Sequence, residues 1–231
     1  MWPRDIHCHA ARTAETGIKL SGRVKGIPLS PEGRREAAAL ADALGGVQIA
    51  GIHSSPMQRC LETAEAVRST RGPSVKARPE ISVDERLNEV EYGDWSGREL
   101  RTLAKEPLWS TVQRQPSAVH FPRGESLAAA AARGVAAARE RSSALEDDEV
   151  WLAASHGDVI KAIVADALGT PLDLFQRISI DPASITVIRY GGERPTVVRV
   201  NDSGTPLATL LSARPKGSLL DRIRGRTGGV G

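Results

Sequence analysis

Hydrophobic and polar positions follow two different periods along the chain, and local stop signals separate the segments. A helix is predicted after Ser30, because this serine can cap it, Pro31 suits its first turn and a glycine pair ends it. The apolar run at 47–55 predicts a buried strand. The Ser-Pro pair at 55–56 repeats the capping pattern and predicts the start of a second helix.

The alternation of strand and helix patterns continues to about residue 200. The predicted elements are a short strand at 75–79, an alanine-rich helix at 124–147, an apolar strand at 149–155, a helix at 158–169, and two strands at 183–190 and 195–200. Such alternation implies parallel pairing with helices on both faces. We therefore predict an α/β domain over residues 1–211, with three layers and a mostly parallel sheet. Residues 1–7, MWPRDIH, lack the apolar run expected of a first strand.

The region at about 92–124 breaks this alternation. Short helical patterns interrupted by prolines predict a small helical insertion there. Ligands of α/β sheets bind at the carboxyl ends of the strands, so an insertion that leaves the sheet at that edge would cover the site. Its residues Trp95, Trp109, His120 and Arg123 suggest a pocket lining that is partly apolar and partly cationic.

Composition and charge narrow the function classes. Aromatic residues make up only 3%, so a nucleic-acid surface built on base stacking is not expected. The net charge of +3 arises in residues 212–231, where five basic residues against one acidic give +4 and leave −1 elsewhere. We predict that this Gly-rich tail is disordered. No run of about 18 apolar residues and no signal peptide are visible, so we expect a cytoplasmic protein without a membrane partner.

A histidine–cysteine cluster stands near the start of the chain. His7, Cys8 and His9 could bind a metal or take part in redox chemistry. Additional ligands would be required, and His53 and His120 fit no recognised ligand spacing. With only two cysteines in the chain, a disulfide scaffold is excluded. The alternative is that the cluster is an altered phosphate-binding motif.

Two helix starts favour anion binding. An apolar strand ends at Ser155-His156-Gly157, and a helix begins at once, so its free N–H groups lie beside His156. In IHSSPMQRC the first turn of another helix carries Arg59, which adds a planar guanidinium. The simpler interpretations are a capping turn with an ordinary histidine and a solvated surface arginine.

An acidic cluster is the third chemical signal. Glu85, Glu89 and Glu91 lie within seven residues of each other. A carboxyl group in a cleft beside a bound anion has a raised pKa and can donate a proton. A solvated acidic surface is the simpler interpretation of the same residues.

Together these segments resemble the histidine phosphatase superfamily, also called phosphoglycerate-mutase-like, and look closest to its phosphomutase branch. The resemblance covers roughly residues 9–200, with the motifs in family order. SSPMQRCLETA places the family's second-motif arginine on Arg59, RLNEVEYGDWSG places its proton donor on Glu89, and SHGDVIKAIVADALG places its second histidine on His156.

The resemblance implies a metal-independent phosphatase that acts on a small phosphorylated metabolite and needs no cofactor. His9 would be the nucleophile that forms a phosphohistidine, and Glu89 would be the general acid and base. The substrate-binding residues would be Arg59, His156, Arg12 and Arg23. A phosphomutase and a non-catalytic phosphate-ligand-binding relative are the alternatives. No nucleic-acid partner is expected, and a homodimer is compatible with the sequence.

The chain departs from the family pattern at its first motif. The usual Arg-His-Gly is Cys8-His9-Ala10, Arg12 replaces a serine or threonine, and Glu15 replaces an asparagine. The departures fit a weakened relative or a misread start of the gene. Since one missing oxyanion contact costs roughly 100- to 1000-fold in rate, we do not expect full family-level activity.

Overall fold

The computed structural model describes residues 4–70, 78–146, 149–190, 194–206 and 208–209. These residues form one six-stranded sheet with the strand order β3-β2-β4-β1-β5-β6. The strands β1, β2, β3 and β4 pair in parallel, whereas β5 runs antiparallel to β1 and to β6. Their bounds are β1 (Arg4–His9), β2 (Gly51–Ser54), β3 (Ile81–Val83), β4 (Val150–Ser155), β5 (Ile185–Arg189) and β6 (Thr196–Asp202).

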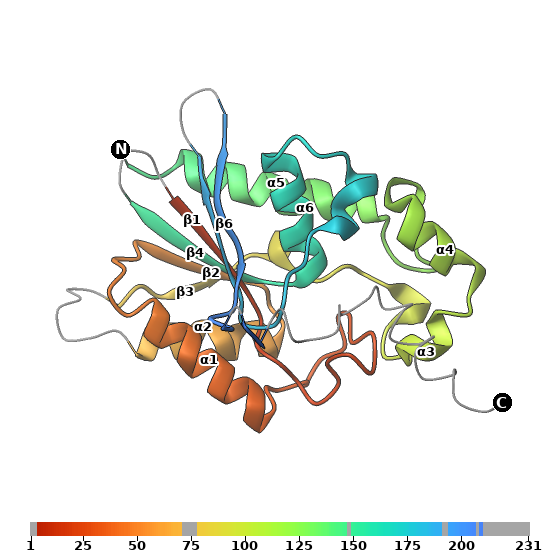
Figure 1. Ribbon diagram of the computed structural model, residues 1–231, viewed down its shortest axis with the longest axis horizontal. Helices are drawn as coiled ribbons and strands as arrows, with labels where there is room; N and C mark the ends of the chain where they lie inside the picture. The colour runs from red at the N-terminus through yellow and green to blue at the C-terminus, as the bar shows by residue number, and fades with distance from the viewer. Residues whose placement is uncertain (1–3, 71–77, 147–148, 191–193, 207, 210–231) are drawn as a thin grey trace.

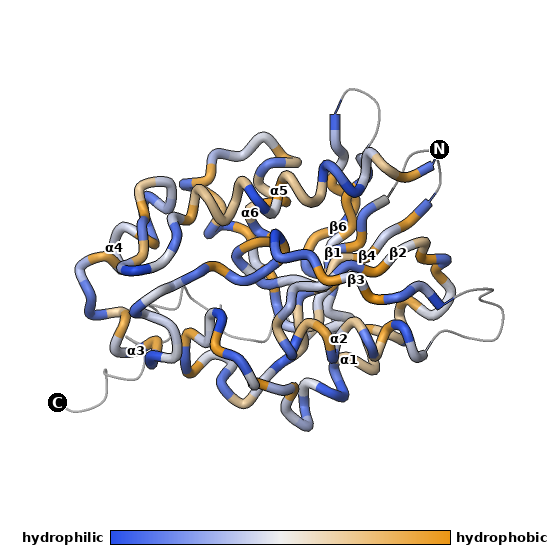
Figure 2. The backbone as a smooth tube through the Cα atoms, turned by 180° about the vertical axis from the view of Figure 1, so that it is seen from behind, coloured by the Kyte–Doolittle hydropathy of each residue, from blue (hydrophilic) through white to orange (hydrophobic). Residues whose placement is uncertain are grey.

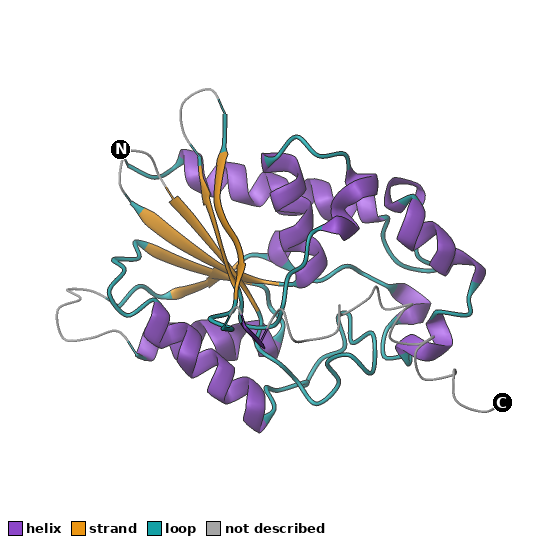
Figure 3. Ribbon diagram, viewed as in Figure 1, coloured by secondary structure: helices purple, strands orange, loops and turns teal. Residues whose placement is uncertain are grey.

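Helices cover both faces of the sheet (Figures 1 and 3). One face carries α1 (Pro31–Ala43) and α2 (Gln58–Ser69), and the other carries α5 (Leu127–Ser143) and α6 (Gly157–Ala167). Ser30 caps α1 as predicted, because its side chain accepts a hydrogen bond from the Gly33 N–H. The predicted three-layer α/β fold with a mostly parallel sheet is confirmed.

Side-chain alternation along the strands divides the hydrophobic core between the two faces. Ile6, Cys8 and Leu152 pack toward α1 and α2, whereas Trp151 and Ala153 pack toward α5 and α6. Figure 2 shows hydrophobic stretches along the central strands and polar stretches along the loops. Each face of the sheet therefore has its own buried cluster, and residues one apart on a strand belong to different clusters.

The region at 92–124 is a helical insertion, as predicted. It contains α3 (Leu100–Leu103) and α4 (Pro107–Arg114) with the short 3-10 turns η2 (Gly93–Trp95) and η3 (Pro116–Ala118), and it packs beside α5 and α6 (Figure 1). Two further 3-10 turns are η1 (Glu85–Leu87) and η4 (Leu172–Arg177). The expected pocket lining was wrong for the two tryptophans: Trp95 and Trp109 are buried in the insertion's own core, where their rings stack. His120 and Arg123 are exposed.

The first strand differs from the sequence-based expectation. The strand β1 lies at the centre of the sheet, paired with both β4 and β5, although four of its six residues are arginine, aspartate or histidine. The buried Asp5 carboxylate accepts hydrogen bonds from the Trp151 Nε1–H at 2.6 Å and the Ser142 hydroxyl at 2.6 Å. A buried carboxylate is tolerated there because charged hydrogen bonds replace those of water.

Two element boundaries also differ from the predictions. The helix α2 begins at Gln58 with Met57 as its N-cap, and no side chain caps it. The strand that the structure describes in this region is β3, Ile81–Val83, and residues 75–77 of the strand predicted at 75–79 lie outside the described residues. The basic tail at 212–231 also lies outside them.

None of the helices in the described part of the chain has the length and apolar character needed to cross a membrane.

Candidate active site

The candidate site lies where the parallel strands end. β2 and β4 end at Ser54 and Ser155, and the helices that follow, α2 and α6, begin within a few residues. His156 is the N-cap residue of α6, and its side chain makes no cap hydrogen bond. The N-terminal ends of both helices therefore meet at the carboxyl edge of the sheet, which favours anion binding.

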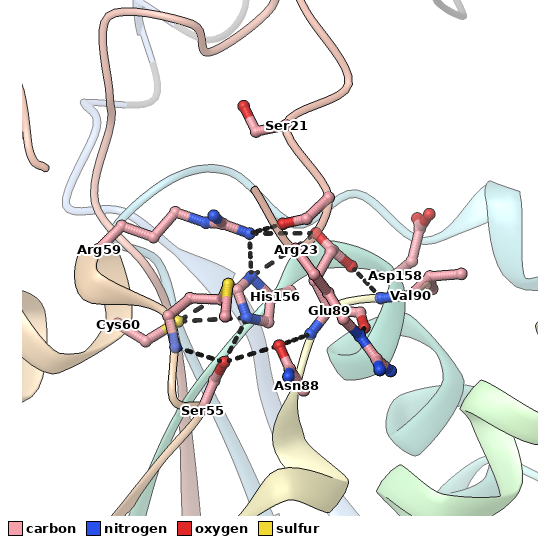
Figure 4. A network of polar contacts seen from close by, with 12 residues as sticks. Ser21, Arg23, Ser55, Arg59, Cys60, Asn88, Glu89, Val90, His156 and Asp158 are labelled. Carbon is pink, nitrogen blue, oxygen red and sulfur yellow. Dashed lines mark hydrogen bonds and ion pairs between the residues drawn. The ribbon is translucent and has the colours of Figure 1, made fainter. Parts of the chain in front are cut away.

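Arg59 and His156 are in direct contact, as Figure 4 shows. The Arg59 Nη2 lies 3.0 Å from His156 Nδ1 and donates to the Gly22 carbonyl at 2.9 Å. A guanidinium can only donate hydrogen bonds, so Nδ1 of His156 must be the unprotonated acceptor. Burial and the Arg59 charge hold the pKa of His156 well below its ordinary value, in agreement with a neutral ring.

The other ring nitrogen of His156 is held by Ser55. Because Nδ1 accepts, Nε2 carries the proton and donates it to the Ser55 hydroxyl at 2.7 Å. The Cys60 thiol lies 3.4 Å from the same nitrogen, and burial raises the pKa of Cys60 to about 12, so the thiol stays protonated. Ser55 was predicted to cap α2, but its hydroxyl does not cap the helix and instead binds His156 Nε2.

Glu89 completes the cluster. Its carboxylate Oε2 lies 3.9 Å from Arg59 Nη2 and 3.6 Å from His156 Nδ1. Its Oε1 accepts a hydrogen bond from the Val90 N–H at 2.9 Å. The side chains of Arg59 and Glu89 are 10% and 14% exposed, so both groups remain reachable from outside while His156 is completely buried.

The Glu89 carboxyl has the properties of a proton donor. Burial raises its pKa to about 7, and the neighbouring Asp158 carboxylate acts in the same direction. The charges of Arg59 and Arg133 oppose the shift. A carboxyl with a pKa near neutrality can hold a proton at the pH where a phosphate ester is bound, and can release it to a leaving group.

Asp158 belongs to the first turn of α6 and links the insertion to the site. It accepts hydrogen bonds from the Tyr92 hydroxyl at 2.9 Å and from Lys161 Nζ at 3.2 Å. These bonds fix a negative charge near Glu89, and this charge is the second largest cause of the raised pKa of Glu89. From the sequence, residue 158 was predicted only as the start of a helix. Its role near Glu89 could not be predicted, because the partners of Asp158 include Tyr92, which is distant in the sequence.

His9 makes no hydrogen bond to this cluster in the described residues. Its ring packs against the backbone of Gly157, where a Cβ atom would lie 3.6 Å from Cε1. Within the described residues, no hydrogen bond or ion pair links His9 to Arg59, His156 or Glu89. Burial lowers the pKa of His9 to about 4; an interaction with the Asp181 backbone opposes this shift, whereas the Arg59 charge adds to it. The ring is therefore neutral, as a nucleophile requires.

Strand register sets the face of the sheet on which each of these side chains lies. His9 pairs with Ser155, and the N–H of Ala10 donates to the Ser155 carbonyl. The residue that follows β1 at the same level as His156 is therefore Ala10. Ala10 packs in the cluster that contains Cys60, whereas His9 contacts the start of α6. Adjacent side chains of a strand point to opposite faces.

The same alternation bears on the metal interpretation of His7-Cys8-His9. The Cys8 thiol is buried toward α1 and α2, and burial raises its pKa to about 12. His7 lies on the other face, with its ring edge-on to Trp151. The three side chains therefore do not converge on one point. Among the residues that the structure describes, no group of three or more His, Cys, Asp or Glu residues is arranged to hold a metal ion.

Arg12 does not join the cluster in which it was predicted. Its Nε donates to Glu36 Oε1 at 3.1 Å, and its backbone N–H donates to Glu36 Oε2 at 3.0 Å. Glu36 lies on α1, and Arg12 borders a 510 Å³ cavity together with it. The acidic partner on α1 holds the guanidinium, and this pairing across 24 residues had no local signal in the sequence.

Arg23 contacts the backbone of Glu89 in the candidate site. Its Nε donates to the Glu89 carbonyl at 2.7 Å, and its two terminal nitrogens bind Glu91 and Glu125 at 2.7 and 2.9 Å. All of its nitrogens are thus engaged by protein oxygens. The structure places Arg23 as a support for the Glu89 backbone, whereas the sequence suggested a substrate contact.

Gly22 was also missed by the sequence analysis. Its φ is +54°, and an added Cβ would lie 2.9 Å from the Ser96 hydroxyl and 3.0 Å from the Tyr92 ring. Only glycine fits this left-handed, crowded position. The turn allows the Gly22 carbonyl to hold Arg59, so the segment between β1 and α1 helps to orient the guanidinium.

Comparison with known proteins shows the family of the chain. The model of the histidine phosphatase superfamily (branch 1) matches residues 6–203, and the chain belongs to that superfamily. Phosphoserine phosphatase 1 of Hydrogenobacter thermophilus is 28% identical over 196 residues, covering 82% of this chain and 89% of that protein.

Two further relatives agree in sequence and in fold. A glucosyl-3-phosphoglycerate phosphatase of Mycolicibacterium vanbaalenii is 30% identical over 172 residues, covering 71% of this chain and 73% of that protein. The solved structure of Bacillus stearothermophilus YhfR has a TM-score of 0.78 and 28% identity, and the match covers 87% of this chain and 97% of that one. Phosphatases are thus among the chain's relatives.

Proposed function

We propose that this protein is a metal-independent phosphatase of small phosphomonoesters that works through a phosphohistidine at His9. The observation that carries the proposal is the contact of Arg59 with His156 beside the Glu89 carboxyl at the carboxyl edge of the sheet. A guanidinium, a buried imidazole and the N-terminus of α6 together suit the oxygens of a phosphoryl group. Guanidinium groups can neutralise phosphoryl charge without a metal ion.

The first step transfers the phosphoryl group to the protein. A nitrogen of neutral His9 attacks phosphorus, the bond between phosphorus and the ester oxygen breaks, and the leaving oxygen takes the proton of the Glu89 carboxylic acid. The depressed pKa of His9, about 4, and the raised pKa of Glu89, about 7, provide both protonation states between these values.

The second step returns the protein to its starting state. The Glu89 carboxylate takes a proton from water, the water oxygen attacks phosphorus, and the bond from phosphorus to His9 breaks. The products are inorganic phosphate and protonated Glu89. Cys8 carries no charge toward this site, so we expect a rate roughly 100- to 1000-fold below that of a relative with an arginine there.

The strand register supports a second candidate, a phosphate-ligand-binding protein without turnover. Ala10 stands level with His156, and His9 has no hydrogen bond to the Arg59–His156 pair in the described residues. A nucleophile must come within about 3–3.5 Å of the reacting atom. If no ring nitrogen of His9 comes within that distance of phosphorus when the ligand binds, the site holds a phosphoryl group but does not transfer it.

Two measurements on one protein separate the candidates. Release of inorganic phosphate is assayed with EDTA present, using phosphoserine and glucosyl-3-phosphoglycerate because relatives are named for them. Binding of orthovanadate is titrated calorimetrically. Turnover with EDTA supports the phosphatase, and vanadate binding without turnover supports the binding protein. Turnover that is lost with EDTA and restored by zinc contradicts the metal-independent mechanism.

A matched pair of variants tests the acid. Glu89→Gln should lower kcat by about 100- to 10,000-fold, the usual contribution of a general acid or base, and leave vanadate affinity nearly unchanged. Glu91→Gln is the control, since Glu91 is two residues away, is half exposed and binds Arg23. A crippling effect of Glu91→Gln with a harmless Glu89→Gln would move the proton donor to Glu91.

A further inference from the structure

Arg133 of α5 contacts the backbone of the segment that carries Glu89. Its Nη1 donates to the carbonyls of Arg86 and Asn88 at 2.7 and 2.6 Å, and its Nη2 donates to the Glu89 carbonyl at 3.0 Å. The Arg133 side chain is 18% exposed. One guanidinium therefore holds three carbonyl oxygens within four residues.

Glu125 fixes this guanidinium from the opposite side. Its two carboxylate oxygens accept from Arg133 Nη2 at 2.7 Å and from Arg133 Nε at 3.2 Å. Glu125 also accepts from the Glu91 N–H at 2.8 Å and from Arg23 at 2.9 Å. Burial would raise the pKa of Glu125, but the hydrogen bonds from Arg133 and the Glu91 backbone lower it below its ordinary value.

The Glu89 carboxyl depends on this support because little else holds it. Its only hydrogen bond in the described residues comes from the neighbouring Val90 N–H, and Arg59 Nη2 lies 3.9 Å away, beyond hydrogen-bond distance. Between η1 and η2 the segment has no helix or strand hydrogen bonds of its own. The position of the carboxyl is therefore set by the backbone that Arg133 and Glu125 hold, together with Arg23, whose Nε donates to the same Glu89 carbonyl.

We propose that Arg133, oriented by Glu125, is a positioning residue that sets where the Glu89 carboxyl stands in the site. This inference rests on the proposed function only in the role it gives Glu89. Lysine cannot replace Arg133, because a single ammonium nitrogen cannot span three carbonyls and a carboxylate as the planar guanidinium does.

Arg133→Lys separates positioning from charge. The groups near Glu89 are Asp158 and His156 from α6 and its cap, Arg59 from α2, Arg133 from α5, and Arg23 and Tyr92 from the loops. Lysine keeps the charge at position 133, so an electrostatic role leaves the pKa of Glu89 at about 7. A positioning role predicts that the segment loosens, water reaches the carboxyl and its pKa falls toward the ordinary 4.5.

The experiment is a carbon-13 NMR titration of protein labelled at the glutamate carboxyls, with the Glu89 signal assigned by its loss in Glu89→Gln. Arg139→Lys is the matched control, because Arg139 lies on the same helix, is 60% exposed and pairs with Asp166. We expect the pKa of Glu89 to fall by about one unit or more in Arg133→Lys and to stay unchanged in Arg139→Lys. An unchanged pKa in the folded Arg133→Lys protein overturns the proposal.

Amide exchange provides a second readout in a milder variant, in case Arg133→Lys does not fold. Glu125→Gln retains the shape of residue 125 but loses its charged hydrogen bonds, so the Glu91 N–H should exchange about tenfold faster. Unchanged exchange contradicts the proposal. Neither readout requires turnover: if the parent protein hydrolyses no ester, the proposed function fails while the positioning role is still tested.

Discussion

The strands β1 and β4 are neighbours in the sheet, yet they differ greatly in composition. β4 reads VWLAAS and is buried throughout, whereas β1 reads RDIHCH and still occupies the adjacent central position. His156, which follows β4, contacts Arg59, whereas His9 at the end of β1 contacts Gly157 at the start of α6. An apolar strand is stabilised by packing alone. A buried polar strand also needs hydrogen-bond partners for its side chains, as Asp5 has in Trp151 and Ser142.

The largest expected effects come from substituting the two histidines, His9 at the end of β1 and His156 directly after β4. His9→Ala should lower kcat about 1000-fold or more and change vanadate affinity little, because His9 is the proposed nucleophile and makes no hydrogen bond to the Arg59–His156 pair in the described residues. His156→Ala should lower both vanadate affinity and kcat/KM, the latter by about 100- to 1000-fold, because Arg59 loses the partner that orients it. Equal turnover of His9→Ala and the parent would show that β1 supplies no nucleophile.

The pH profile sharpens the same comparison. kcat/KM should rise as the pH increases through about 4, where His9 loses its proton, and should fall above about 7, where Glu89 loses its proton. Each limb should change by about tenfold per pH unit. In Glu89→Gln the upper limb should disappear and the lower limb should remain. A profile without a fall above about pH 7 would contradict the Glu89 assignment, and one without a rise through about pH 4 would contradict the His9 assignment.

The polar interior of β1 offers a test of stability. Asp5→Ala should lower the free energy of unfolding by about 2–3 kcal/mol, because it leaves the buried Trp151 N–H and Ser142 hydroxyl without their charged acceptor. Urea denaturation measures this difference. Asp42→Ala is the control, since Asp42 is exposed on α1, and its effect should stay within about 0.5 kcal/mol. Equal effects of the two variants would show that the Asp5 bonds contribute no net stability.

The smallest effect is expected from a substitution that makes β1 more apolar, as β4 is. His7 is completely buried, and in the part of the chain that the structure describes neither ring nitrogen has a hydrogen-bond partner; Asp5 Oδ2 lies 3.8 Å from Nε2. His7→Leu should therefore raise the free energy of unfolding by about 1 kcal/mol. The measurement is again urea denaturation, with the exposed His120→Leu as control. A marked loss of stability would instead assign His7 a role in holding Asp5.

Some parts of the candidate site could be predicted because their signals are local. Arg59, Glu89 and His156 each stand in a motif next to a helix or strand end, and the structure brings these three together. Arg12 and Arg23 carry equally plausible charges, but their carboxylate partners lie on distant elements. A guanidinium binds the nearest well-placed acceptor, and the tertiary fold decides which acceptor that is.

By itself the sequence determined the elements whose causes lie within a few residues. Ser30 and Pro31 start α1, and the apolar run of β4 leads into α6, because capping and burial patterns act locally. Only the tertiary structure decided that a polar β1 is central, that Cys8 and His9 face opposite sides, and that Arg133 holds the Glu89 backbone. Those outcomes depend on strand register and on hydrogen bonds between residues far apart in the chain, for which a single sequence contains no local signal.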